Sequence, residues 1–332
     1  MTIKDQVEYT NILVRATNWV GDAVMSLPAL GAIRERYPKA HIAVLAKPWV
    51  AGLYSRESFA DEVIPYDRSR WAMARVLRQR TFDCAILLQN AFDAALIAWL
   101  ARIPVRIGYN RDGRGLLLTR AVKTPAPGEI PRHQRFYYLE LLRRAGILDA
   151  LPSSDAIHLE GGGSRHRRRL VGVSPGAAYG TAKQWLPERF AEAAARVAEA
   201  RGAEIALFGS AGERELCDQV AALLNGHKVT NYAGRTTLAE FIDVASQCEL
   251  FLTNDSGAMH IASALGVPTV AVFGATDDVA TGPTGPLSRV VREPVDCSPC
   301  LLRECPIDHR CMTRVTAERV ATEALKIVEL VR

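Results

Sequence analysis

The fold of this chain is constrained most strongly by an alternation of short apolar runs with longer amphipathic runs, which occurs twice along its 332 residues. In the first half, apolar runs at 11–16, 41–46, 62–65, 83–88 and 105–108 alternate with helical patterns at 23–36, 48–55, 69–79 and 91–102. Another helix is expected between Pro131 and Gly146. Strands that alternate with helices indicate βαβ units and a parallel sheet that helices cover on both faces.

The alternation restarts in the second half, after a break at 149–170 that contains three consecutive glycines and a basic run at 165–169. Strands are expected at 170–174, 203–208, 228–230, 249–252 and 268–272, and helices at 187–201, 212–224, 237–247, 257–265 and 316–331. We interpret the break as a linker with a solvated charge run, the alternative being contact with an anionic partner.

The predicted fold is therefore α/β, with two Rossmann-like, doubly wound parallel-sheet domains that face each other across a cleft. The expected domains are residues 1–160 and 161–315, followed by a C-terminal helix, 316–332, that is free to pack back on the first domain. In such sheets, ligands bind at the carboxyl ends of the strands.

Charge and hydropathy exclude several classes of protein. No stretch approaches the ~20 uncharged apolar residues of a membrane span, and the N-terminal segment lacks the apolar core of a signal peptide, so a cytoplasmic protein is expected. The net charge of +5 favours anionic substrates or a membrane surface. This excess falls short of what a nucleic-acid-binding protein carries, so no nucleic-acid partner is expected.

The most informative local pattern in the second half is a strand that ends at Thr253, followed by the turn Asn254–Gly257 and a helix. Asp255 and Ser256 occupy positions where a side-chain oxygen caps a helix. The small residues of the first turn also leave its backbone amides open to an anion, which the helix dipole stabilises. Taken alone, this pattern is consistent with a helix cap or with an anion-binding site.

Two further strand ends favour an anion site. The loop 174–186 consists mostly of small residues and contains Lys183, which is either a surface lysine or a positive charge for a diphosphate. The segment 206–215 brings Glu213 and Glu215 to a helix start, where acids complement the helix dipole or hold ribose hydroxyls. An anion loop, a lysine and an acid are thus expected at the same edge of one sheet.

The first half lacks a phosphate loop. It has no G-x-G-x-x-G after its first strand, and no G-x-x-x-x-G-K-[ST] occurs anywhere, which argues against dinucleotide oxidoreductases and P-loop enzymes. Its first strand-to-helix turn carries Asp22, which suits a general base that deprotonates a hydroxyl, or caps the helix. A serine hydrolase fits poorly because Ser256 lacks the G-x-S-x-G turn, and His260 can reach either a ligand or the helix backbone.

Five segments carry a resemblance to a known family. They are NWVGDAVMSLPAL (18–30), RIGYNRDGRGLLLT (106–119), SPGAAYGTAKQWLPERF (174–190), FGSAGERE (208–215) and TNDSGAMHIASALGVPTVAVFGATD (253–277). In this order they resemble glycosyltransferase family 9, the ADP-heptose:lipopolysaccharide heptosyltransferases. The resemblance implies a GT-B architecture, an acceptor bound by the N-terminal half and ADP-heptose bound by the C-terminal half. It also implies an inverting transfer that needs no metal and no other cofactor.

The resemblance also assigns roles to residues. Asp22 matches the catalytic base. The residues that match the donor-binding motifs are Thr181, Lys183, Asp255, Ser256, Gly257 and His260. An acid, either Glu213 or Glu215, would hold the ribose. Three arginines of the first half suit the phosphates and carboxylates of a lipopolysaccharide inner core, namely Arg106, Arg111 and Arg114.

The expected activity is transfer of L-glycero-D-manno-heptose from ADP-heptose to heptosyl-Kdo2-lipid A, a lipid-linked acceptor at the cytoplasmic face of the inner membrane. The enzyme is expected to be a monomer that contacts the membrane surface peripherally. Alternatives within the family are addition of the first or a later heptose, or of a different sugar. Outside it, a sugar-nucleotide epimerase would produce an epimer from the donor alone, and a non-catalytic sugar-nucleotide-binding protein would tolerate Asp22→Ala.

A cysteine-rich segment near the C-terminus has the spacing C-x2-C-x4-C-x3-H-x-C. Thiolates and imidazole are ligands that Zn²⁺ accepts, and the candidates are Cys297, Cys300, Cys305, His309 and Cys311. Disulfides and reduced, unliganded cysteines are the alternatives. A zinc ion here would be structural, because the segment follows the donor motifs.

Overall fold

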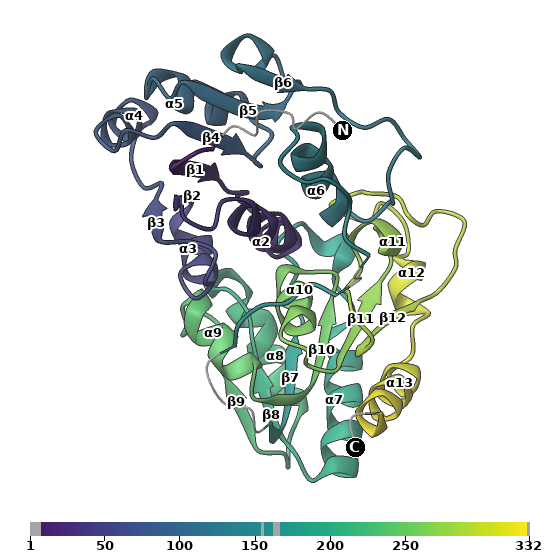
Figure 1. Ribbon diagram of the computed structural model, residues 1–332. Coiled ribbons are helices and arrows are strands. Elements are labelled where there is room, and N and C mark those ends of the chain that lie inside the picture. Colours follow the sequence, from purple (N-terminus) through teal and green to yellow (C-terminus); the bar gives the residue numbers. More distant parts are fainter. Residues whose placement is uncertain (1–7, 154–155, 162–166, 331–332) are drawn as a thin grey trace. The chain divides into compact units, whose positions relative to one another are not determined.

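The computed structural model describes residues 8–153, 156–161 and 167–330, so residues 154–155 and 162–166 of the predicted linker lie outside the described residues. The chain divides into two compact units, Met1–Ser153 and Ser154–Arg332. Each unit contains one six-stranded sheet whose paired strands are all parallel (Figure 1). The α/β class and two Rossmann-like domains are thus confirmed.

The sheet of the first unit has the strand order β3-β2-β1-β4-β5-β6. Its strands are β1 (Asn11–Arg15), β2 (His41–Ala46), β3 (Glu62–Pro65), β4 (Cys84–Leu87), β5 (Val105–Tyr109) and β6 (Arg120–Val122). The helices are α1 (Val20–Met25), α2 (Leu27–Arg36), α3 (Pro48–Tyr54), α4 (Arg70–Arg78), α5 (Phe92–Leu100) and α6 (Arg135–Arg144), with a 3₁₀ turn η1 (Gly115–Leu117). Helices α4 and α5 pack side by side, and α6 packs against α2.

One helix predicted in this unit is two helices. The pattern at 23–36 suggested a single helix, but α1 ends at Met25 and α2 begins at Leu27. Pro28 lies in the first turn of α2, where its missing N–H is tolerated, and it cannot continue a preceding helix. The separate, short α1 carries Asp22 in its first turn.

The sheet of the second unit has the order β12-β11-β10-β7-β8-β9. Its strands are β7 (Arg168–Ser174), β8 (Glu204–Leu207), β9 (Val229–Asn231), β10 (Cys248–Asn254), β11 (Thr269–Phe273) and β12 (Ser288–Arg292). The helices are α7 (Pro187–Arg201), α8 (Arg214–Leu223), α9 (Leu238–Ala245), α10 (Gly257–Ala264), α11 (Asp278–Thr281), α12 (Arg310–Thr313) and α13 (Ala317–Glu329). Two 3₁₀ turns, η2 (Thr181–Lys183) and η3 (Ala211–Glu213), follow β7 and β8.

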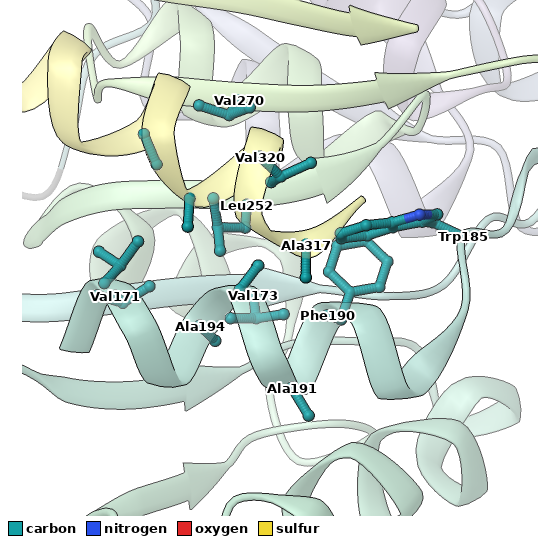
Figure 2. Close-up of a cluster of buried hydrophobic side chains, with 14 of the residues drawn as sticks. Val171, Val173, Trp185, Phe190, Ala191, Ala194, Leu252, Val270, Ala317 and Val320 are labelled. Atoms are coloured by element: carbon teal, nitrogen blue, oxygen red, sulfur yellow. The ribbon is translucent and has the colours of Figure 1, made fainter. Parts of the chain in front are cut away.

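The C-terminal helix α13 is part of the second unit. Its apolar side packs against α7 and against β10, β11 and β12, and Ala317 and Val320 are buried in the cluster that Figure 2 shows. Trp185 lies at one end of this cluster, where its indole N–H donates to the Val315 carbonyl at 3.1 Å. The loop after β7 is thereby fixed to the segment that leads into α13.

Within the described part of the chain, no helix combines the length and the apolar character that crossing a membrane requires.

Candidate active site

Asp22 lies at the carboxyl end of β1, in the first turn of α1, and it does not cap that helix. The N-cap residue is Trp19, and no side-chain bond caps the helix there. The Asp22 carboxylate is partly exposed, and its Oδ1 accepts a hydrogen bond from the Tyr138 hydroxyl at 3.0 Å. A carboxylate that is reachable from solvent and is oriented by a hydrogen bond from a tyrosine hydroxyl has the geometry of a general base.

Tyr138 comes from α6 and is buried. Burial raises the pKa of its hydroxyl well above the usual value, and the negative charge of Asp22 raises it further. The hydroxyl therefore stays protonated at physiological pH and remains a donor to Asp22. Nothing in the local sequence around Asp22 indicated this residue, which lies 116 positions away.

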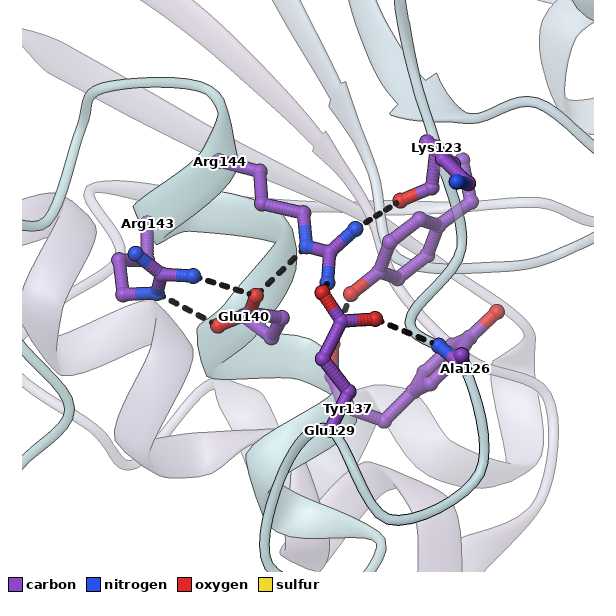
Figure 3. A network of polar contacts seen from close by, with 8 residues as sticks. Lys123, Ala126, Glu129, Tyr137, Glu140, Arg143 and Arg144 are labelled. Atoms are coloured by element: carbon purple, nitrogen blue, oxygen red, sulfur yellow. Dashed lines mark hydrogen bonds and ion pairs between the residues drawn. The ribbon is translucent and has the colours of Figure 1, made fainter.

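The C-terminal half of α6 is fixed by a network of charges (Figure 3). The buried Glu140 carboxylate accepts two hydrogen bonds from Arg143 at 2.7 Å and one from Arg144 at 2.6 Å. Arg144 also pairs with Glu129, whose other carboxylate oxygen accepts the Ala126 amide. The pKa of Glu140 is held below its usual range, mainly by the hydrogen bonds from Arg143. This network holds the helix that positions Tyr138.

The three arginines proposed for acceptor binding have different positions, and for Arg114 the prediction was wrong. Its side chain is fully buried, and its guanidinium donates to the carbonyls of Tyr109 and Gln89 and to Asn90. Burial lowers its pKa to about 10.

Arg106 is also largely used by the fold, because its guanidinium donates to the carbonyls of Leu117 and Ile103. Arg111 is exposed, near the Tyr137 hydroxyl at 3.4 Å. Arg106 and Arg114 therefore hold the fold together through bonds to main-chain carbonyls. Of the three arginines, only Arg111 remains open to a ligand.

In the second unit, loops that follow three adjacent strands meet at Asp255. This residue follows β10, and its Oδ2 accepts hydrogen bonds from Lys183 Nζ at 2.6 Å and from Thr276 Oγ1 at 2.5 Å. Lys183 lies on the loop after β7, and Thr276 follows β11. Because parallel strands end at the same edge of a sheet, the loop that carries Lys183 and the turn after β10, which was predicted as the anion loop, lie together there.

The Asn254 side chain connects the end of β10 to the loop after β7 through hydrogen bonds to main-chain groups. Its amide nitrogen donates to the Pro175 carbonyl at 2.7 Å, and its Oδ1 accepts the Trp185 amide at 2.9 Å. Sequence reasoning singled out Asp255 and Ser256 but missed Asn254, although a fully buried polar residue at a strand end is a recognisable signal.

The first turn of α10 is not capped by its own side chains. Ser256 is the N-cap residue but makes no side-chain cap bond, and its hydroxyl lies 3.2 Å from Thr253 Oγ1. Asp255 is directed to Lys183 instead. Neither side chain therefore caps the helix. The backbone amides from Gly257 onward lie at an uncapped helix start, which is a favourable place for an anion. His260, one turn later, is buried on this helix.

Of the two acids after β8, Glu213 is the one at the site. Its Oε2 accepts hydrogen bonds from the backbone and hydroxyl of Ser210 at 2.7 and 2.8 Å, as in a capping box. Its Oε1 lies against Gly176, where an added Cβ would come within 2.1 Å of that oxygen. Glu215 is exposed in the first turn of α8. The geometry therefore brings Glu213, and not Glu215, to the loop that carries Lys183.

The loop after β7 is braced by the cysteine-rich segment. Tyr179 donates its hydroxyl hydrogen to the Leu301 carbonyl at 2.8 Å, and the Ala182 amide donates to the Arg303 carbonyl at 2.9 Å. His309 Nε2 lies 3.0 Å from the Ala182 carbonyl. Thr181, the exposed first residue of η2, and Lys183 are thus held from the C-terminal side.

The cysteines themselves are free, with Cys311 buried and Cys297 exposed. Among the residues that the structure describes, no group of three or more histidine, cysteine and acidic side chains is arranged to hold a metal ion. His309, one predicted ligand, is occupied by the Ala182 carbonyl. A zinc site here therefore stays a prediction, and the arrangement of the described side chains does not support it.

Two Rossmann-like domains in one chain are the architecture of the GT-B class of glycosyltransferases, and comparisons with known proteins identify the family. The model of "Glycosyltransferase family 9 (heptosyltransferase)" matches residues 70–310. Lipopolysaccharide heptosyltransferase 2 of Salmonella typhimurium is 32% identical over 305 residues, covering 85% of this chain and 87% of the relative. The solved structure of the E. coli ADP-heptose lipopolysaccharide heptosyltransferase II matches with a TM-score of 0.82 and 30% identity, covering 97% of this chain and 99% of that one.

A more distant relative gives the same assignment. Lipooligosaccharide heptosyltransferase 2 of Campylobacter jejuni is 27% identical over 328 residues, covering 95% of this chain and 98% of the relative. The chain therefore belongs to glycosyltransferase family 9, the heptosyltransferases.

Proposed function

We propose that this protein transfers heptose from ADP-heptose to a heptosyl-Kdo2-lipid A acceptor during synthesis of the lipopolysaccharide core. The relatives named heptosyltransferase 2 support this reaction over an epimerase or a non-catalytic binding protein. The observation that carries the proposal is the division of roles between the units. The first presents a carboxylate oriented by Tyr138, and the second presents a lysine and an uncapped helix start suited to a diphosphate.

The proposed mechanism is an inverting displacement. Asp22 takes the proton from the acceptor hydroxyl while that oxygen attacks the anomeric carbon of the heptose. The bond from the anomeric carbon to the diphosphate oxygen breaks, and the electron pair stays on ADP. Negative charge thus develops on the leaving group, where Lys183 and the amides at the start of α10 stabilise it.

Lys183 must accept a second anionic partner for this role. Its ammonium group is neutralised by Asp255, so the incoming diphosphate has to share it with a carboxylate. Thr276 continues to donate to that carboxylate, which lowers the cost of this sharing. In this proposal Glu213 accepts hydrogen bonds from the ribose hydroxyls, His260 and Thr181 lie alongside the diphosphate, and Arg111 contacts an acidic group of the acceptor.

Transfer is proposed to need no metal ion, because a lysine and helix amides supply positive charge to the leaving group. Dialysis against EDTA is then expected to leave the rate unchanged, and a rate restored only by added Mg²⁺ or Mn²⁺ would contradict this. Inversion is checked by the anomeric configuration of the product, measured by NMR.

We also propose that the protein works as a monomer at the cytoplasmic face of the inner membrane. The outward side of α4 supports membrane contact, because Trp71, Arg75 and Arg78 are exposed along it. Indole and guanidinium groups together suit the interface of an anionic bilayer. Sedimentation with vesicles that contain anionic lipid is expected to fall for Trp71→Ser combined with Arg75→Glu, and light scattering after size exclusion measures the oligomeric state.

The decisive experiment is a transfer assay with ADP-heptose and core acceptors of defined heptose number. The wild type is expected to extend the acceptor with one heptose, and Asp22→Asn is expected to lose nearly all transfer while still binding ADP. Extension of a heptose-free or a longer core would indicate another member of the family. Absence of transfer to every acceptor would contradict the proposal.

A further inference from the structure

Two tryptophans beside Asp22 are unusually exposed. Trp19, which precedes α1, has 62% of its surface accessible, and Trp49, in the first turn of α3, has 58%. Tryptophan carries the largest apolar surface of any side chain, so leaving two of them in water forgoes a sizeable hydrophobic contribution to stability. Helices α1 and α3 contact each other in the same unit. The mechanism above uses neither residue.

Trp19 occupies a position where the local rules for helices favour another residue. It is the N-cap of α1, where serine, threonine, aspartate or asparagine would stabilise the helix by about 1 kcal/mol. Asp22 is the third residue of this helix, three positions after Trp19. A local rule broken beside a candidate base is a mark of function.

Trp49 is held in place although it is exposed. Its indole N–H donates to the Asn18 carbonyl at 2.8 Å, and the Asn18 side chain accepts a hydrogen bond from Arg15 at 2.9 Å. Arg15 is buried at the end of β1. The polar atom of the indole is therefore satisfied by the loop that leads to Asp22, and what remains exposed is apolar ring.

A cation lies over one of the two indoles, that of Trp49. Lys47 Nζ lies 5.8 Å from the centre of the Trp49 ring and 3.8 Å from the centre of the Tyr66 ring. Both contacts favour a fixed position for the ammonium group. We define the indole platform as the exposed rings of Trp19 and Trp49 together with Lys47, which offer apolar rings and one positive charge.

We propose that the indole platform binds the acceptor sugar. The flat apolar rings would contact the C–H face of a pyranose, and Lys47 would pair with an acidic group on the same or the neighbouring sugar. Binding there places a sugar hydroxyl at Asp22, so contact energy away from the reacting atoms serves to orient the nucleophile. This inference rests on the proposed function and adds to the acceptor contact proposed for Arg111.

The test compares Trp19→Ala and Trp49→Ala with Trp99→Ala, a tryptophan of α5 in the same unit that is 49% exposed. The acceptor is the core oligosaccharide freed of its lipid, so that membrane contact does not enter. The KM for this acceptor is expected to rise about tenfold in each platform variant, with the KM for ADP-heptose unchanged. Trp19→Phe is expected to recover most of the loss, and Trp99→Ala to behave as wild type. Lys47→Gln should weaken acidic acceptors more than a neutral analogue.

Direct binding separates this inference from the proposed function. Titration calorimetry of the oligosaccharide measures acceptor binding whether or not transfer occurs, so a failed transfer reaction leaves the platform testable. Trp19→Ala should keep its thermal midpoint, because Trp19 makes no side-chain cap bond. Unchanged oligosaccharide affinity in both alanine variants overturns the proposal. Unchanged affinity with reduced binding to anionic vesicles would assign the two rings to the membrane instead, which also overturns it.

Discussion

Replacing Lys183 by methionine separates a structural role from a ligand-binding role for this residue. Lys183 Nζ and Asp255 Oδ2 are 2.6 Å apart, and the two side chains are only 13% and 5% exposed. At an effective dielectric constant of about 20, the gross attraction is roughly 6 kcal/mol. Removing one partner of a buried pair usually costs about 3–5 kcal/mol, and the remaining hydrogen bond from Thr276 places this case near the lower end. A cost of about 3 kcal/mol lowers the thermal midpoint of a domain of this size by roughly 6–12 °C.

The matching variants make the prediction decisive. Lys183→Met combined with Asp255→Asn should recover most of the lost stability, since no buried charge is stranded. It should still bind ADP about tenfold to a hundredfold more weakly, because a charge-assisted hydrogen bond contributes about 1.5–3 kcal/mol. Asp255→Asn alone frees the ammonium group and should bind ADP at least as tightly as wild type. Calorimetry with ADP measures each affinity. A double variant that binds ADP like the wild type would refute the role of Lys183 in donor binding.

Three further predictions follow from contacts around the two sites. Tyr138→Phe deletes the hydrogen bond to Asp22, so kcat should fall about tenfold with the KM for ADP-heptose unchanged; equal kcat values would show that the hydroxyl does not orient the base. The pKa of Glu140 is lowered by two arginines of α6, so its stabilising contribution is present above about pH 4.3 and is lost as pH falls through the lower pKa of the folded state. The thermal midpoint of the wild type should therefore drop more steeply on acidification than that of Glu140→Gln, and parallel curves would contradict this. Tyr179→Phe loses its bond to Leu301, so the KM for ADP-heptose should rise about threefold to tenfold with kcat retained, and an unchanged KM would count against the brace.

The alternation of strands and helices could be predicted because its signals are local. Helix α7 was predicted at 187–201, where the structure has it, since Pro187 marks its start and Gly202 its end. The short strands β6 and β12 were missed. Both are short edge strands that contain arginine. Charged residues protect an edge strand from pairing with other chains, and they also weaken the apolar pattern by which a strand is recognised in the sequence.

The site residues could be predicted as chemical types, but their partners could not. Asp22 and Lys183 stand out at strand ends, yet their partners Tyr138 and Asp255 are 116 and 72 residues away. Only the tertiary fold decides such pairs. Arg114 shows the converse, because an arginine in a glycine-containing loop looks exposed while this loop folds it inward against main-chain carbonyls.

The brace on the loop after β7 also has a consequence for how the protein is made. Chains are synthesised from the N-terminus, and Leu301 follows Tyr179 by 122 residues. When the loop with Lys183 leaves the ribosome, its contacts to the cysteine-rich segment do not yet exist, nor does the carbonyl of Val315 that holds Trp185. The first sheet is complete in the nascent chain long before the loop with Lys183 gains these contacts. A product that terminates before Leu301 therefore lacks the brace on this loop.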